Sequence, residues 1–252
     1  MRRLTLLVAL LLPGLASADS EQIVLGLSHD EVAITATFTG SDILIFGAVK
    51  RDTPIPAGNP LQVVITVSGP LTPVTVRHKE RRYGIWVNTA SVTVDAAPSF
   101  YAVATTGPLR DVLSETEDLR HSISIPRAIR SVGAAVENSA DYTEALIRVR
   151  AGEGQYRVLE GAVDLEQQTL FRTQVALPAN LIEGNYTTRI FLTRDGKIID
   201  SYEAEIAVQK VGLERWLFNL SYDFPLAYGL LSLAIDIIAG WGASAAFQGL
   251  RR

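Results

Sequence analysis

The chain has 252 residues, a formal net charge of −4 at pH 7 and no cysteine. This length suits one or two domains, and the mild negative charge argues against nucleic-acid binding, which calls for a basic patch or stripe. Without cysteine the chain can form neither disulfides nor thiolate metal sites.

The first 18 residues have the pattern of a secretory signal. Arg2 and Arg3 precede a short apolar run, Leu4–Leu15, and Ala16–Ala18 supply the small residues of a cleavage site. The run is too short to span a bilayer comfortably. We predict cleavage after Ala18, with an uncleaved signal anchor as the alternative.

Residues 19–107 are expected to form a first β unit. Turn-forming pairs such as Gly40-Ser41 and Gly69-Pro70 separate short runs of β-branched and alternating apolar residues. The expected strands are Ile23–Leu27, Val32–Phe38, Asp42–Val49, Leu61–Val67, Val74–Arg77, Ile85–Val87, Val92–Val94 and Phe100–Ala104. Short strands at this spacing are typical of an antiparallel sandwich.

Residues 108–154 change character and are expected to form a helical connector. Ser114 with Glu117 has the form of a capping box, which predicts a helix start. Pro126–Val136 and Tyr142–Arg150 have the residue types of two short helices, and Gly152 is a plausible stop for the second.

Residues 155–210 return to strands. Asp195-Gly196 lies between two apolar runs and predicts a tight hairpin, because both turn residues need positive φ. Tyr186, at the start of a strand, has the context of a tyrosine corner. We therefore predict a mainly β fold with one or two immunoglobulin-like antiparallel β-sandwich units, the second either incomplete or sharing its sheet with the first.

The C-terminal segment is expected to cross a membrane once. Residues 211–224 have an apolar stripe on one helical face and read as an interfacial lead-in. Residues 225–250 are apolar except for Asp236 and Gln248, and their length matches a bilayer span. The basic tail, residues 251–252, places the C-terminus in the cytoplasm by the positive-inside rule.

Asp236 is the residue that most demands an explanation, because a carboxylate near the middle of a span is costly and is a functional candidate by default. At 100° per residue it shares one helix side with small residues: Gly229, Ser232, Gly240, Ala243 and Ser244. Such stripes let two helices approach closely. We predict that this face docks another transmembrane helix. The alternative is a protonated Asp236 that bonds Ser232 one turn back, or nothing specific.

Other constellations predict no catalytic, cofactor or metal site. Ser28-His29-Asp30 is a tempting string, but neighbours on a strand point to opposite faces. The charged run His78–Arg82 is expected to be a solvated turn, with a polar docking patch or a lipid headgroup contact as the alternative. The nucleotide-binding glycine patterns are absent from the sequence.

Several distinct blocks follow one another along the chain: Leu71–Glu80, Gly84–Asn88, Pro98–Val103, Tyr186–Gly196, Lys210–Glu214 and Pro225–Leu230. In this order they resemble the blocks of the alphaproteobacterial putative transmembrane protein family. The resemblance implies an inner-membrane protein without an assigned activity. It also implies a frequent gene neighbour, a sulfite-exporter-like permease of the TauE/SafE type.

These inferences favour a non-enzymatic accessory or interaction protein, with its body in the periplasm of a bacterium and one helix in the inner membrane. The expected partners are the lipid bilayer and either a polytopic protein such as that permease or a second copy of the chain. The alternative is a periplasmic ligand-binding or envelope-sensing module that the helix merely tethers. An enzyme is the third and least favoured interpretation, since no catalytic motif is present.

Overall fold

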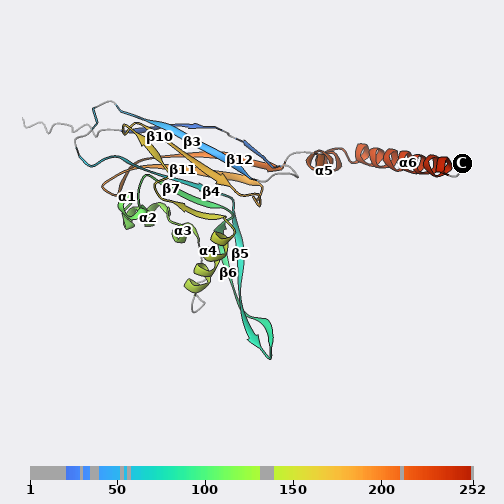
Figure 1. Ribbon diagram of the computed structural model, residues 1–252, viewed down its shortest axis with the longest axis horizontal. Helices are drawn as coiled ribbons and strands as arrows, with labels where there is room; N and C mark the ends of the chain where they lie inside the picture. Colours follow the sequence, from blue (N-terminus) through green and yellow to red (C-terminus); the bar gives the residue numbers. More distant parts are fainter. Residues whose placement is uncertain are drawn as a thin grey trace, which may run out of the picture.

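The computed structural model describes residues 21–28, 31–34, 40–51, 54–55, 58–130, 139–210 and 213–250. Among the described residues, more lie in strands than in helices, which confirms the mainly β prediction. Figure 1 shows a body of β-sheet with helices on one side, a long hairpin that projects from it, and a C-terminal helical segment that extends away. The predicted signal and the two-residue tail lie outside the described residues.

Two sheets form the body, in the strand orders β1-β3-β10-β9 and β2-β12-β11-β4-β7-β8. The four-stranded sheet consists of β1 (Gln22–Leu27), β3 (Ser41–Lys50), β9 (Asp164–Glu166) and β10 (Leu170–Leu177). The six-stranded sheet consists of β2 (Glu31–Ile34), β4 (Gln62–Ser68), β7 (Tyr101–Thr105), β8 (Tyr156–Leu159), β11 (Gly184–Arg194) and β12 (Lys197–Lys210). Each sheet therefore contains strands from both halves of the chain.

One hydrophobic core fills the space between the two sheets. Ile43 and Phe171 from the four-stranded sheet are buried in the same cluster as Ile65 from the six-stranded sheet. Such inward-facing residues recur at every second position, as the period of a strand requires. Residues 19–107 and 155–210 thus form one sandwich between them, because β3 pairs with β10 and β4 pairs with β11.

The expectation of a purely antiparallel sandwich is wrong at both edges of the six-stranded sheet. There β2 pairs in parallel with β12, and β8 pairs in parallel with β7. Parallel neighbours need a long crossover connection. Between β7 and β8 the helical connector provides that crossover, so it closes the fold as well as linking its two halves.

Two local predictions for the second half are confirmed. The β11–β12 hairpin turns at Asp195 and Gly196, whose φ angles are 54° and 72°. The Tyr186 hydroxyl donates a hydrogen bond to the Ile182 carbonyl oxygen at 3.0 Å, which is the contact of a tyrosine corner. Both features depend on residues close in sequence, so a local pattern predicts them.

The connector consists of α1 (Leu109–Val112), α2 (Glu115–His121), α3 (Ile125–Ala128) and α4 (Ser139–Gly152). Its apolar residues form a second core with outward-facing side chains of the six-stranded sheet. The predicted cap is confirmed, since the Ser114 hydroxyl accepts a hydrogen bond from the Glu117 amide at 3.4 Å. The helix predicted over Pro126–Val136 is too long: α3 ends at Ala128, and residues 131–136 lie outside the described residues.

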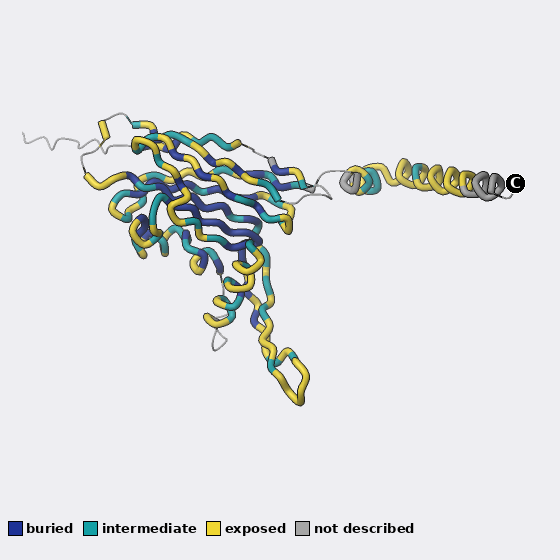
Figure 2. Tube along the Cα trace, in the orientation of Figure 1, coloured by how far each residue is buried: buried dark blue, intermediate teal, exposed yellow. Residues whose placement is uncertain are grey.

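The sequence prediction is also wrong for the charged run His78–Arg82, which lies within a strand. β5 (Leu71–Arg82) and β6 (Ile85–Pro98) form a two-stranded ribbon whose turn is Tyr83-Gly84. The ribbon leaves the body and becomes exposed towards its tip (Figure 2). Three short strands were expected where two long ones exist, because β pairing extends through polar residues that a hydrophobic pattern does not identify as strand.

Buried tyrosines make the fold sensitive to alkali. Tyr156 donates a hydrogen bond to the Pro98 carbonyl oxygen at 2.8 Å, and burial raises the pKa of its phenol to about 12. Burial also raises the pKa of Tyr101 and of Tyr186. An unfolded chain, in which phenols ionise near pH 10, binds fewer protons than the folded chain above that pH, so stability falls as the pH rises from about 10 to 12.

We expect Tyr156 alone to account for a loss of about 2 kcal/mol in the free energy of unfolding across this window. The Tyr156→Phe variant should be about 1 kcal/mol less stable than the parent at pH 8, for want of the hydrogen bond, yet lose less stability towards pH 12. Urea unfolding followed by circular dichroism at several pH values measures both slopes. Equal slopes in parent and variant would contradict the assignment.

Two helices follow the body. They are α5 (Leu213–Asp223) and α6 (Pro225–Leu250), in the segments predicted as lead-in and span. In α5 the rings of Phe218 and Tyr222 stack with their centroids 5.6 Å apart, and both are exposed. Within α6, the stretch from Pro225 to Gly242 is long and apolar enough to cross a membrane by length and composition.

Candidate functional site

Helix α6 is the first candidate site, because the chain itself leaves it uncovered. None of the residues from Pro225 to Gly242 is buried, and large apolar side chains such as Leu230, Ile238 and Trp241 are more than two-thirds exposed. Figure 2 shows the helix exposed along its described length. A hydrophobic helix in this state needs lipid or another helix around it.

The predicted docking face lies along this helix. Gly229, Ser232, Asp236 and Gly240 are all exposed. A methyl group added at Gly229 or Gly240 would meet no atom within 4 Å, so packing inside the chain does not require glycine at either position. The side chains of Ala243 and Ser244 lie outside the described residues.

Asp236 gives this face its chemical character. Its carboxyl group stands in a helix whose neighbouring positions are Ile235 and Ile237, both more than half exposed. Hydrocarbon would offer the carboxyl group no hydrogen bond, and an ionised carboxylate at the centre of a span costs a few kcal/mol. A donor on a neighbouring helix would remove part of this cost. The arrangement is suited to recognition within a membrane.

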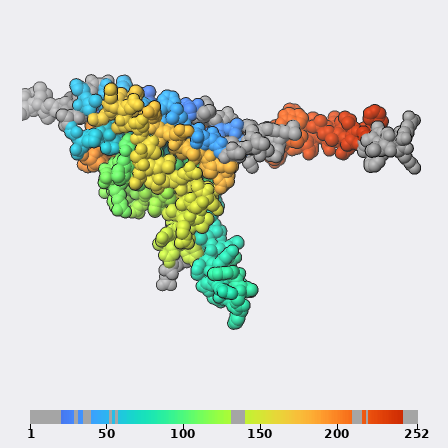
Figure 3. Space-filling model, in the orientation of Figure 1, coloured from blue at the N-terminus to red at the C-terminus, as the bar shows by residue number. Residues whose placement is uncertain are grey.

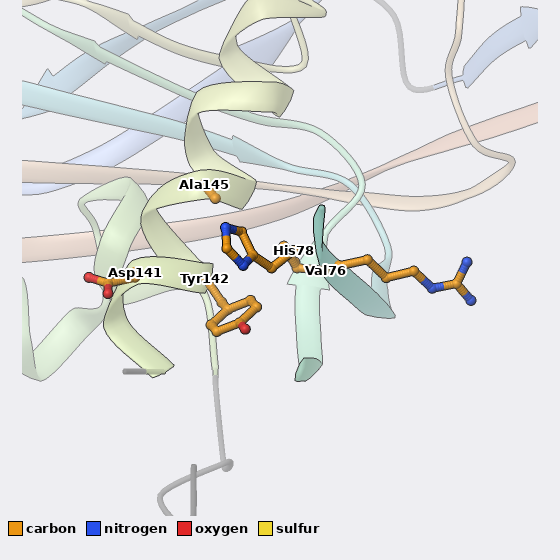
Figure 4. A pocket seen from close by; sticks show the side chains of 6 residues that line it. Val76, His78, Asp141, Tyr142 and Ala145 are labelled. Carbon is orange, nitrogen blue, oxygen red and sulfur yellow. The ribbon is translucent and has the colours of Figure 1, made fainter. Parts of the chain in front are cut away.

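A small pocket of about 240 Å³ lies between α4 and the base of the β5–β6 hairpin. His78, Asp141 and Tyr142 are among the residues that line it, together with Val76 and Ala145. Figure 4 shows the His78 ring beside Tyr142, with the Asp141 carboxylate turned away from the imidazole. The histidine instead approaches Glu80 on its own strand, with Nδ1 and Oε1 3.7 Å apart. The pocket therefore does not present a histidine and a carboxylate to one bound atom.

The sequence analysis missed two polar clusters, one buried and one half-buried. In one, Glu21 meets the guanidinium groups of Arg51 and Arg194. In the other, Arg189 binds carbonyl oxygens at the end of α2 and the hydroxyl of Tyr101. Their partners lie far apart in sequence, so no local spacing reveals them. Both clusters join separate elements of the fold, which gives them a structural role.

Comparison with known proteins agrees with the architecture. The sequence profile of one family matches residues 22–249, which run from the first strand of the sandwich to the last turn of α6. No curated protein matches the chain. The match covers nearly all of the described structure, and the chain has one apolar C-terminal helix by which it associates with a membrane. The chain belongs to the family described as Putative transmembrane protein (Alph_Pro_TM).

Proposed function

We propose that this protein is a non-enzymatic accessory protein that binds a polytopic membrane partner through the Asp236 face of α6. The observation that carries the proposal is a carboxylate on a helix in which no residue from Pro225 to Gly242 is buried. A helix that served only as an anchor would gain nothing from a residue that is costly to insert. A helix that docks another uses such a residue as a hydrogen-bond acceptor or donor.

The glycines beside Asp236 support the same proposal. Gly229 and Gly240 have open space around them, so they leave a shallow groove on either side of the carboxyl group. A second backbone can approach there and bring its own polar groups within hydrogen-bonding reach. A sulfite-exporter-like permease, the gene neighbour that the family resemblance implies, is the partner we favour.

The proposed topology places the sandwich in the periplasm and the C-terminus in the cytoplasm. The basic start and cleavage site at residues 1–18 support export of the body, and Arg251 with Arg252 supports a cytoplasmic end. We also assign the sandwich to the immunoglobulin-like class. The tyrosine corner at Tyr186 supports this assignment.

Replacing Asp236 with leucine tests the proposal. We expect the amount of co-purifying membrane partner to fall at least ten-fold, since a lost interhelical hydrogen bond and a filled groove both weaken docking. Gly240→Leu, on the same face, should act in the same direction. Ala234→Leu, on the opposite face, adds a similar side chain and should change nothing. Pull-downs from native membranes in mild detergent, with quantitative mass spectrometry, measure all three.

The outcome also identifies the partner. Loss of a polytopic protein supports the accessory role, whereas loss of only the chain's own oligomer would show that the face mediates self-association. An unchanged set of co-purifying proteins and an unchanged oligomeric state in Asp236→Leu would rule out docking through this face.

A ligand-binding or envelope-sensing module is the second candidate. Within the part of the chain that the structure describes, neither hydrophobic core of the body includes a residue of α6, so the described packing of the sandwich does not depend on the helix. If a body joined to an unrelated anchor restores the phenotype of a deletion strain, the α6 face is dispensable and this second candidate is the better one.

A further inference from the structure

The tip of the β5–β6 hairpin is a second exposed surface, separate from α6. Figure 3 shows the hairpin standing out from the body as a narrow arm. Its base is braced by α4, and His78 is the last residue of β5 that lines the pocket between them. From His78 to the turn at Tyr83 the ribbon extends about 15 Å further, at about 3.3 Å per residue.

The arm is basic although the whole chain is acidic. From residue 77 to residue 91, the outer part of the hairpin has four basic side chains, Arg77, Lys79, Arg81 and Arg82, and one acidic side chain, Glu80, which gives a formal charge of +3. The chain as a whole carries −4. This charge separation concentrates a positive field on a small projecting surface, which attracts anionic partners.

The two faces of the arm differ. Glu80 and Arg82 form an ion pair on one face, with Oε2 and Nη2 3.2 Å apart. On the other face Arg81 is registered opposite Trp86, and Lys79 follows two residues along. Among the described residues, the side chains of Lys79 and Arg81 have no ion pair or hydrogen bond. One face is therefore partly neutralised and the other presents free cations beside an aromatic ring.

Large apolar side chains occupy the end of the arm. Tyr83 is fully exposed, and Ile85 and Trp86 are 64% and 69% exposed. Tyr83 and Gly84 both have positive φ, 51° and 87°, a turn type in which asparagine or aspartate is favoured at the first position. The exposed Tyr83 side chain does not stabilise the fold by packing against it. Its position is better explained by contact with something outside the chain.

The strand directions place the base of the arm at the end of the body that leads into α5. β4 and β12 are both antiparallel to β11, so they run in the same direction. The end of β4, which leads into the arm, therefore lies at the same end of the six-stranded sheet as the end of β12, which precedes α5 and α6. From there the arm projects sideways from the body, across the direction of α5 and α6 (Figure 1).

We propose that the tip of the β5–β6 hairpin binds the anionic phospholipid surface of the same membrane that holds α6. In the bound state, lysine and arginine bind the headgroup phosphates, and Tyr83 and Trp86 enter the interface beside them, where amphipathic rings are favoured. The contact does not require the Asp236 face to bind a partner. With the tip and α6 both attached, the sandwich would be fixed at one angle to the bilayer.

A protein surface is the less favoured occupant because the tip is small. Stable protein interfaces involve about 20–30 residues on each side, whereas residues 79–88 number ten. A headgroup layer needs no matching shape, so a few cations and two aromatic rings suffice.

The absence of cysteine permits a direct test with the full chain. A fluorescent label is placed at Tyr83→Cys, or at Lys197→Cys as a control at the end of β12 remote from α5, and the chain is reconstituted alone in nanodiscs. We expect a headgroup-attached quencher to quench the Tyr83 label at least five-fold more in discs with one-third phosphatidylglycerol than in pure phosphatidylcholine. The Lys197 label should stay unquenched in both.

A charge series identifies the cause. With the Tyr83 label, Lys79→Gln with Arg81→Gln should lower tip binding by an order of magnitude or more, about five-fold for each cation. Arg127→Gln with Arg148→Gln, a matched pair on exposed helix positions, should leave it unchanged. An unquenched Tyr83 label in anionic discs would overturn the proposal. If the label is shielded in native membranes but not in the nanodiscs, the tip binds a membrane protein and the proposal is wrong.

Discussion

Replacing Glu21 with leucine is expected to lower the free energy of unfolding by about 3 kcal/mol, because it strips a buried cation of its counter-ion. The side chains of Glu21 and Arg51 are 4% and 8% exposed, and the Arg51 guanidinium donates to the Glu21 carboxylate. Arg194 Nη2 lies 3.1 Å from both carboxylate oxygens. Arg51 also donates to Gln168 and Thr169 in the turn before β10, so the cluster joins the first described residue to three distant segments.

A double-mutant cycle separates the charge effect from packing. Glu21→Leu with Arg51→Met replaces the pair by two apolar side chains, and it should recover at least half of the stability lost in Glu21→Leu. Urea unfolding of the full chain in detergent, followed by the circular dichroism of the sheets, gives the four free energies. A Glu21→Leu chain within 0.5 kcal/mol of the parent, about the usual effect of a surface substitution, would show that the cluster contributes little.

Replacing Arg189 with methionine is expected to cost about 3 kcal/mol and to loosen the connector. The guanidinium of Arg189 donates to the carbonyl oxygens of His121 at 2.8 Å and Ser122 at 3.1 Å, where α2 ends. It also donates to the Tyr101 hydroxyl at 3.2 Å and lies 5.4 Å from the centre of the Phe191 ring. Hydrogen bonds from charged groups contribute about 1.5–3 kcal/mol each, and their loss leaves acceptors unpaired.

Lysine at position 189 is the informative control. It keeps the charge but has a compact ammonium group in place of a planar fork of donors. We therefore expect Arg189→Lys to recover less than half of the loss. Arg148→Met, at an exposed position of α4, should stay within about 0.5 kcal/mol of the parent. Hydrogen exchange of α2 amides reports whether the loosening is local. Unchanged protection of α2 in Arg189→Met would contradict the capping role.

The sequence predicts features whose determinants lie within a few residues of one another. The cap at Ser114, the turn at Asp195-Gly196 and the corner at Tyr186 all belong to this class. The apolar helix α6 does too, because its length and composition are local properties. At the cap, the turn and the corner, one hydrogen bond or one φ angle limits which residue types can occupy the position. The sequence pattern therefore predicts these features.

The sequence does not predict how distant strands pair. Ser68 lies opposite Thr187, and Ala48 lies opposite Leu170, yet β-branched residues fit either side of a half-buried sheet equally well. The sequence therefore leaves open whether the body is one sandwich unit or two, and only the strand pairing of the structure decides between them. The polar clusters at Glu21 and Arg189 follow from that pairing, which explains why no spacing indicated them.

The sequence also predicts one of the two exposed surfaces better than the other. The face around Asp236 comes entirely from helical periodicity, and its docking role stays a prediction until a partner is found. The sequence predicts a solvated turn at the hairpin tip, with a polar docking patch or a lipid headgroup contact as the alternative, because a search for alternating apolar residues does not recognise a strand in a run of charges. Its aromatic end and its projection from the body appear only when β5 and β6 are paired.

Each sheet pairs strands from early in the chain with strands from late in the chain, and this order limits when the protein can fold during its synthesis. The four-stranded sheet needs β10 and the six-stranded sheet needs β11 and β12, which all come late in the chain. Topologies dominated by pairing between distant strands fold slowly. Until the late strands are synthesised, the edges of the early strands stay unpaired, and unpaired edges favour aggregation. The ribosome makes α6 soon after the last strand, so membrane insertion and closure of the sandwich fall in the same interval. A chain truncated before β10 would complete neither sheet and should be cleared by proteolysis.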